Sequence, residues 1–250
     1  MDHSSHVAIV TGAAQGIGRV YAQALAEDGA TVVAADLNEA GAQETARLIT
    51  EAGGKALAAQ VDVSDKQSTL DLAGLVSSEF GAAHILVNNA AIYHSMRNDR
   101  QLDVDIDYWR KVMSVNLDGA LLMTQAFAPL LIEAGWGRIV NQTSTAAYLG
   151  GGGHYGVSKL AVIGLTQGFA QELGHHGITV NALAPGVIMT EATKVTVDES
   201  VIRGLAAAIP LQHQAVPDDL VGAMRFLTGE DAAWMTGQTL IVDGGMVKRF

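Results

Sequence analysis

A tyrosine and a lysine four residues apart, Tyr155 and Lys159, carry the clearest chemistry in this sequence. In a helix, residues i and i+4 lie on the same face, so the phenol and the ammonium would be neighbours. A free phenol has a pKa of about 10 and is a poor base at neutral pH, but a nearby positive charge stabilises the phenolate and lowers that pKa. The spacing therefore predicts an acid/base pair in which Tyr155 exchanges a proton.

Ser144 supplies a third group for the same chemistry. It follows the apolar run 138–142 and precedes Tyr155 by 11 residues. Its hydroxyl can hold a substrate oxygen beside the phenol and stabilise the charge that develops there while hydride moves to or from the adjacent carbon. Together the three side chains predict the interconversion of an alcohol and a carbonyl compound.

A glycine-rich turn indicates the dinucleotide that such a reaction needs. The segment Thr11-Gly12-Ala13-Ala14-Gln15-Gly16-Ile17-Gly18 leads from an apolar run into helical sequence. Its glycines allow a tight turn and let the backbone approach a pyrophosphate at the helix N-terminus. Asp36 ends the next apolar run, where its carboxylate can accept hydrogen bonds from the adenosine ribose and repel a 2′-phosphate. NAD is therefore expected and NADP is less favoured, with Arg19 as the one nearby cation.

The elements that position these groups are apolar runs alternating with helix-sized amphipathic segments. The strand-like runs are residues 7–10, 31–35, 56–61, 85–87, 138–142, 178–182 and 239–242. This alternation predicts an α/β fold, a Rossmann-like doubly wound parallel sheet of about seven strands with helices on both faces. We expect one domain over residues 1–250, with a substrate lid at about 187–218 that contains a helix-like piece over 198–208.

The motifs resemble those of the short-chain dehydrogenase/reductase family, whose glycine signature is Thr-Gly-x-x-x-Gly-x-Gly. The resemblance covers nearly the whole chain and continues in Asp62-Val63, Asn88-Asn89-Ala90-Ala91, Val115-Asn116-Leu117, Asn181-Ala182-Leu183-Ala184-Pro185-Gly186, Thr190, Thr236-Gly237-Gln238 and Val242-Asp243-Gly244-Gly245. Ala91 departs from the glycine that ends the family's Asn-Asn-Ala-Gly motif, and Thr143 takes the first of two positions that are usually serine.

The resemblance implies roles for individual residues. The catalytic set would be Asn116, Ser144, Tyr155 and Lys159, with Asn116 ordering a water that relays protons between Lys159 and solvent. Lys159 would also bind the nicotinamide ribose. The cofactor-binding set would be Gly12, Gln15, Gly16, Ile17, Gly18, Asp36, Leu37, Asp62, Val63, Asn89, Ala90, Ala91, Tyr155, Lys159, Pro185, Gly186, Val187, Ile188 and Thr190. Helices over 108–134 and 155–174 correspond to those that pair between subunits in the family, which implies a homo-oligomer, a homotetramer.

The substrate is predicted from the residues expected around Tyr155. The predicted substrate contacts are Ser144, Tyr148, His154, Tyr155, Tyr93, His94 and Met189, joined by Val201, Ile202 and Leu205 of the lid. This largely apolar set suits a neutral, small or medium secondary alcohol and its ketone.

Two alternatives stay open. A 3-oxoacyl-thioester (acyl-carrier-protein) reductase of the same family is one, although the acidic charge and Asp36 argue against it. A non-catalytic NAD-binding redox sensor is the other, and the intact Tyr155 and Lys159 argue against that.

Composition narrows the partners further. The chain has 250 residues, no cysteine and a formal net charge of −11, so a thiolate metal site is excluded, and nucleic acid and anionic membranes are not expected as partners. The histidines show no metal-ligand spacing, and no metal is expected. No secretory signal is recognised, and no apolar run approaches the length of a membrane span. These features predict a cytoplasmic protein.

Overall fold

Parallel strands form the central sheet of the computed structural model, which describes residues 2–93, 96–97, 99–150, 152–191, 193, 204 and 209–248. The strands are β1 (Val7–Thr11), β2 (Thr31–Asp36), β3 (Lys55–Gln60), β4 (Ile85–Asn88), β5 (Gly137–Gln142), β6 (Ile178–Pro185) and β7 (Thr239–Val242). Their order in the sheet is β3-β2-β1-β4-β5-β6-β7. Since the order reverses between β1 and β4, a crevice opens there beyond the carboxyl ends of the strands. The predicted Rossmann-like fold is confirmed.

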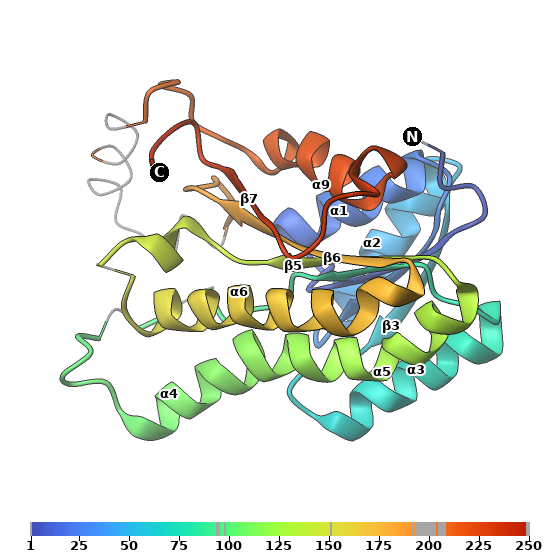
Figure 1. The fold of residues 1–250 in the computed structure, drawn as a ribbon, viewed down its shortest axis with the longest axis horizontal. Coiled ribbons are helices and arrows are strands. Elements are labelled where there is room, and N and C mark those ends of the chain that lie inside the picture. The colour runs from blue at the N-terminus through green and yellow to red at the C-terminus, as the bar shows by residue number, and fades with distance from the viewer. Residues whose placement is uncertain are drawn as a thin grey trace.

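Helices cover both faces of the sheet (Figure 1). One face carries α1 (Gly16–Glu27), α2 (Glu39–Glu51) and α9 (Val221–Thr228), and the other carries α3 (Lys66–Phe80), α5 (Gly119–Ala134) and α6 (Gly153–Leu173). Neighbouring strand residues point to opposite faces, so Ala8 and Val10 of β1 pack in the core under α1 while Ile9 packs in the core under α5. Short helical turns connect these elements: η2 (Thr145–Tyr148), η3 (Gly174–His176), η4 (Pro217–Leu220) and η5 (Glu230–Ala232).

A long continuous helix runs over residues 106–134. It consists of α4 (Ile106–Met113), a π-helical segment η1 (Ser114–Asp118) and α5. By length and composition alone this helix could cross a membrane, although no run of this length was predicted from the sequence. Its residues Met123, Phe127 and Leu131 are fully buried against the sheet. That is the position of a core helix, which passes the same test of length and composition.

The predicted lid is described only in part. The chain leaves β6 at Pro185, and Met189 N donates to Ala215 O at 2.8 Å, which ties the two ends of the segment together. Val201, Ile202 and Leu205 and most of the helix-like piece 198–208 lie outside the described residues. The lid and the single-domain organisation therefore stay predictions.

Candidate active site

A cleft of ≈1030 Å³ lies beyond the carboxyl ends of the strands. It runs from the turn between β1 and α1, past the ends of β2 and β4, to α6 and the end of β6. All residues of the predicted cofactor-binding set line it except Val187. The structure thus brings together residues that the sequence separates by more than 170 positions, from Gly12 to Thr190.

Two glycines of the turn, Gly12 and Gly18, leave no room for a side chain. A Cβ on Gly12 would lie 2.8 Å from Asn89 Nδ2, and one on Gly18 would lie 2.1 Å from Gly12 O. Gly12 and Gly16 also have φ values of 66° and 56°, in the left-handed region that favours glycine. Asn89 Nδ2 donates to Thr11 O at 2.9 Å, so the end of β4 supports the turn. The bare backbone at the N-terminus of α1 forms a cradle that fits a pyrophosphate.

Asp36 presents its carboxylate to the same cleft. Its Oδ2 accepts from Ala14 N and its Oδ1 accepts from Asn38 N, each at 2.9 Å. Arg19, the nearby cation, donates to Ala14 O and, through Nε, to Thr45 Oγ1 at 3.0 Å. The carboxylate is therefore held in place by backbone amides, while the guanidinium is engaged by the turn and by α2.

Tyr155 and Lys159 both lie on α6 and line the cleft. Lys159 is 2% exposed, and its Nζ donates to Gln142 O at 2.8 Å. Burial lowers the pKa of Lys159 to about 8, because desolvation disfavours the ammonium. The pKa of Tyr155 is raised by burial and by the neighbouring Tyr93, whereas a side-chain hydrogen bond with Ser144 acts in the opposite direction. The lowering of the phenol pKa by a nearby positive charge stays a prediction.

The hydroxyls at the end of β5 have different partners. Thr143 is buried, and its Oγ1 donates to Lys159 O at 2.6 Å. Ser144 is partly exposed at the cleft, and its Oγ accepts from Ala146 N at 3.1 Å. Since the Thr143 hydroxyl donates its hydrogen bond to α6, Ser144 is the residue whose hydroxyl can bind a substrate oxygen.

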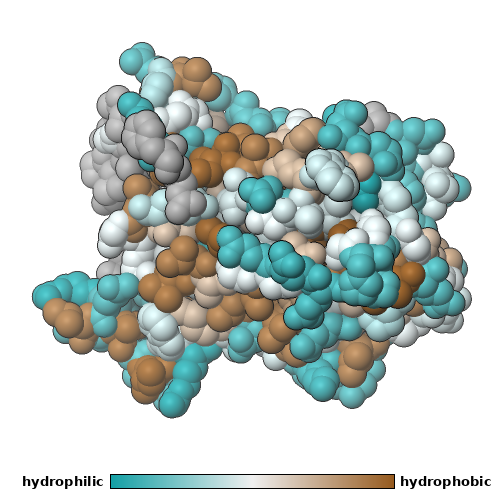
Figure 2. Space-filling view, in the orientation of Figure 1, coloured by the Kyte–Doolittle hydropathy of each residue, from teal (hydrophilic) through white to brown (hydrophobic). Residues whose placement is uncertain are grey.

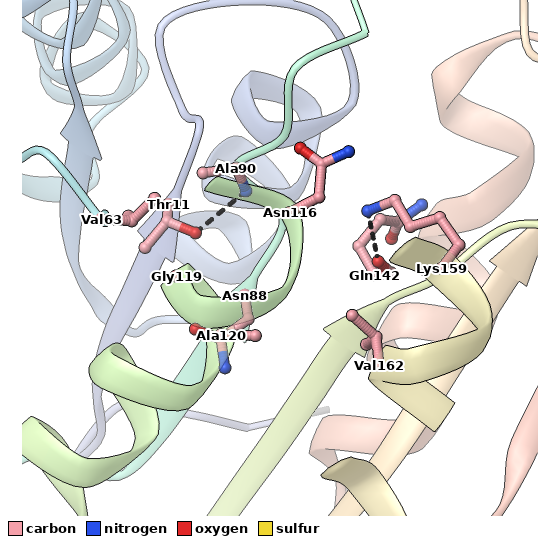
Figure 3. A pocket seen from close by; sticks show the side chains of 10 residues that line it. All are labelled: Thr11, Val63, Asn88, Ala90, Asn116, Gly119, Ala120, Gln142, Lys159 and Val162. Atoms are coloured by element: carbon pink, nitrogen blue, oxygen red, sulfur yellow. Dashed lines mark hydrogen bonds between the residues drawn. The ribbon is translucent and has the colours of Figure 1, made fainter. Parts of the chain in front are cut away.

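Asn116 lies in the π-helical segment η1, behind the cleft. Its Oδ1 accepts from Ile92 N at 2.7 Å, and its Nδ2 donates to Ile92 O and to Ser158 Oγ, each at 3.3 Å. Figure 3 shows Asn116 and Lys159 at a small cavity of ≈10 Å³. Such a volume is about the minimum for one water molecule. The predicted water relay stays a prediction.

The predicted substrate contacts are divided by the structure. Tyr93, Ser144 and Tyr155 line the cleft, and the rings of Tyr93 and Tyr155 are 5.3 Å apart between centroids. Tyr148, His154 and Met189 do not line the cleft, and His94 lies outside the described residues.

His154 shows why a sequence neighbour of Tyr155 need not share its site. It is 2% exposed and packs edge-on against the Tyr108 ring, 5.5 Å away between centroids. Successive helix residues point about 100° apart, so the imidazole points away from the face that carries the phenol.

Several polar residues at the cleft were not predicted from the sequence. Lys111, Ser114 and Glu191 line it, which makes the lining less apolar than predicted. Lys111, Ser114 and Val115 stand at i, i+3 and i+4, the spacing that places residues on one helix face. This spacing could have indicated from the sequence that the three residues face the same side of the helix.

Comparisons with known proteins agree with this arrangement. The chain matches the family model described as enoyl-(acyl carrier protein) reductase over residues 12–247. It is 49% identical over 245 residues to an uncharacterized oxidoreductase of Mycobacterium tuberculosis, with 98% of each chain covered. It is 39% identical over 253 residues to the (3R)-3-hydroxyacyl-CoA dehydrogenase of Homo sapiens, with 97% of this chain and 95% of the human one covered. A Beutenbergia cavernae structure, described as an NAD(P)-dependent gluconate 5-dehydrogenase with NADP bound at low occupancy, matches with a TM-score of 0.91 and 36% identity over 98% of both chains.

Proposed function

Because the chain belongs to the short-chain dehydrogenase/reductase family of oxidoreductases, we propose that it interconverts a secondary alcohol and a ketone by hydride transfer with NAD(H). The observation that carries the proposal is that Tyr155, Lys159 and Ser144 line one cleft together with the glycine turn. A phenol, an ammonium and a serine hydroxyl beside a dinucleotide cradle are the groups that this reaction requires.

The residues of the chain would handle the proton and the substrate oxygen. A bound nicotinamide ring would accept hydride from the alcohol carbon, or return it to the ketone. Ser144 would hold the substrate oxygen, and Tyr155 would take the hydroxyl proton in oxidation and give it back in reduction. Lys159 would favour the phenolate through its positive charge. Since burial raises the pKa of Tyr155, we infer that the phenol becomes a base when a further positive charge, such as that of an oxidised nicotinamide ring, lies beside it.

The preference for NAD is part of the proposal. The family uses NAD or NADP, and the gluconate 5-dehydrogenase structure holds NADP, so the comparisons do not favour NAD. Asp36 supports it, because a fixed carboxylate at the expected ribose position repels a 2′-phosphate.

A 3-hydroxyacyl or 3-oxoacyl thioester is the second candidate substrate. It is favoured by the 39% identity to the human (3R)-3-hydroxyacyl-CoA dehydrogenase over nearly the whole chain. The net charge of −11 disfavours docking of an acidic carrier protein, although it does not bear on a free thioester. A non-catalytic sensor is disfavoured, since Tyr155, Lys159 and Ser144 are all at the cleft.

Reduction of NAD⁺ and NADP⁺ across a substrate panel tests both candidates. The panel contains neutral secondary alcohols, dihydrodiols, a 3-hydroxyacyl-CoA thioester and sugars, and absorbance of the reduced nicotinamide is recorded. We expect turnover with a neutral secondary alcohol and NAD⁺, and none with the Tyr155→Phe variant. Turnover of the thioester alone would transfer the assignment to the second candidate. If the protein binds NADH but turns over no member in either direction, the proposed function is wrong.

We further propose that the enzyme acts as a homotetramer in the cytoplasm on a small-molecule alcohol or ketone, without nucleic acid, membrane or metal. The tetramer is supported by exposed apolar side chains on α6, including Val157 and Leu160, which are 37% and 51% exposed. In Figure 2, apolar side chains lie around the beginning of α6, with hydrophilic side chains over other parts of the same face. The cytoplasmic location is supported by the Rossmann-like fold, and cell fractionation would test it.

A further inference from the structure

A buried chain of hydrogen bonds connects α1 to Lys159. The Tyr21 hydroxyl donates to Gln142 Oε1 at 3.2 Å, and Lys159 Nζ donates to Gln142 O at 2.8 Å. Tyr21 is 0% exposed, Gln142 is 7% exposed and Lys159 is 2% exposed. Figure 3 shows the contact between Lys159 and Gln142 at the edge of the small cavity. Gln142 therefore joins the helix that follows the glycine turn to the catalytic helix α6.

The register of the sheet explains why the Gln142 carbonyl is available. Strand β4 ends at Asn88, which pairs with Asn141, so no β4 residue stands opposite Gln142. Backbone groups of successive strand residues point to alternate sides, and Thr143 N donates toward β6, to Leu183 O. The carbonyl of Gln142 thus points to the side where β4 has ended, and the Lys159 ammonium takes the place of a strand partner.

A second hydrogen bond connects the end of β5 to Lys159 on α6. Thr143 Oγ1 donates to Lys159 O at 2.6 Å, so the end of β5 binds the lysine through both its side chain and its backbone. A buried ammonium needs acceptors of this kind, because an unpaired charge would be strongly disfavoured away from water. The orientation of the Gln142 peptide then determines where the ammonium lies relative to the Tyr155 ring.

We propose that Gln142, held by the Tyr21 hydroxyl, is a positioning residue that fixes the Lys159 ammonium for its action on Tyr155. The inference rests on the proposed role of Lys159. Tyr21 does not line the cleft, so an effect of its hydroxyl on the site cannot arise from contact with substrate or cofactor. Gln142 lines the cleft, which is why the two residues must be tested as a pair.

The test is a double-mutant cycle of Tyr21→Phe and Gln142→Met, read by titration of the Lys159 ammonium. The Nζ resonance of Lys159 in ¹⁵N-lysine-labelled protein is followed against pH with and without NAD⁺, and it is assigned by its loss in Lys159→Met. Because Gln142 O is a fixed acceptor for the charged form, its displacement lowers the pKa of Lys159 further, by about 0.5 or more, in each single variant. Because both variants break one connection, the double variant is expected to match the singles rather than their sum. Tyr108→Phe, which removes a hydroxyl that accepts from Arg97 N, is the matched control and should leave the titration unchanged.

The outcomes separate this inference from the proposed function. Titration curves that match the unsubstituted protein in both single variants overturn the inference, even if the melting temperatures fall. Additive shifts in the double variant also overturn it, since they would mean that Tyr21 and Gln142 act separately. Failure to bind NAD⁺ would count against the proposed function, while the titration without NAD⁺ would still report on Tyr21 and Gln142.

Discussion

The Lys159 ammonium lies 5.7 Å from the centre of the Tyr155 ring, with Lys159 buried and its Nζ bound to the backbone. At this distance the charge can act on the phenol without a direct hydrogen bond to it. Burial nevertheless keeps the pKa of Tyr155 above its ordinary value in the protein alone.

Tyr155→Phe is expected to lower kcat by about 10²-fold or more, because the ring remains but no proton can be exchanged. NADH affinity should stay within about twofold, since the glycine turn and Asp36 are unchanged. Steady-state assays give the first quantity, and quenching of protein fluorescence by NADH gives the second. A loss of NADH affinity as large as the loss of kcat would contradict the acid/base role.

Asp36→Ala is expected to shift the cofactor preference toward NADP by about tenfold or more, because the carboxylate that repels a 2′-phosphate is gone. The ratio of kcat/KM with NAD⁺ to that with NADP⁺ measures the shift. Glu44→Ala is the matched control: Glu44 also lines the cleft, but its carboxylate pairs with Arg47 at 2.7 Å. An unchanged ratio in Asp36→Ala would remove the basis for the NAD preference.

The strands and the order of the motifs could be predicted from the sequence, because buried parallel strands appear in it as runs of apolar residues. The main difference in the sheet is β6, predicted to end at Ala182 and observed to reach Pro185. Proline usually ends a strand because it cannot donate to the ladder. Here Pro185 is in register with Val242 of β7, and Gly186 N donates to Val242 O at 3.0 Å, so the pairing continues past the missing donor.

The parts of the candidate site that depend on a backbone shape could be predicted from a sequence motif. The parts that depend on where a side chain points were harder to predict. The glycine turn and Asp36 line the cleft as predicted, but Val187 does not, because being next to a lining residue does not determine where a side chain points. The hydrogen bond from Tyr21 to Gln142 spans 121 positions, and no local pattern could indicate it.

The homotetramer can be tested on α6. Light scattering at micromolar concentration should give about four times the chain mass. Leu160→Glu places a charge among exposed apolar side chains and should lower that mass, because burying an unpaired carboxylate in an interface is unfavourable. Leu70→Glu is the control, since Leu70 is 43% exposed and lies on α3, which is not one of the two helices expected to pair between subunits. A monomer in the unsubstituted protein would exclude the tetramer.

A cluster of histidines lies at the amino ends of β1 and β4, at the end of the strands opposite to the cleft. His3 Nδ1 and His6 Nδ1 are 3.1 Å apart, and the His6 ring stacks on Trp136 at 4.2 Å between centroids. The Arg138 guanidinium lies 4.2 Å from the centre of the Trp136 ring, and His84 Nδ1 accepts from the backbone. Burial lowers the pKa of all three imidazoles below 6.5, and the Arg138 charge adds to this for His3 and His6.

This cluster predicts loss of stability in weak acid. A histidine whose pKa is lower in the folded chain than in the unfolded chain binds fewer protons when folded, so the free energy of unfolding falls as pH drops below about 6.5 and through the folded pKa. We expect the melting temperature to fall by several degrees between pH 7 and pH 5, and the fall to be smaller in the double variant His3→Gln, His6→Gln. The pH dependence is the readout, because the glutamines also change packing. His175→Gln with His176→Gln, two adjacent residues in η3, is the control and should keep the full acid-dependent fall. If the His3 and His6 double variant loses as many degrees as the unsubstituted protein, groups other than His3 and His6 cause the acid sensitivity.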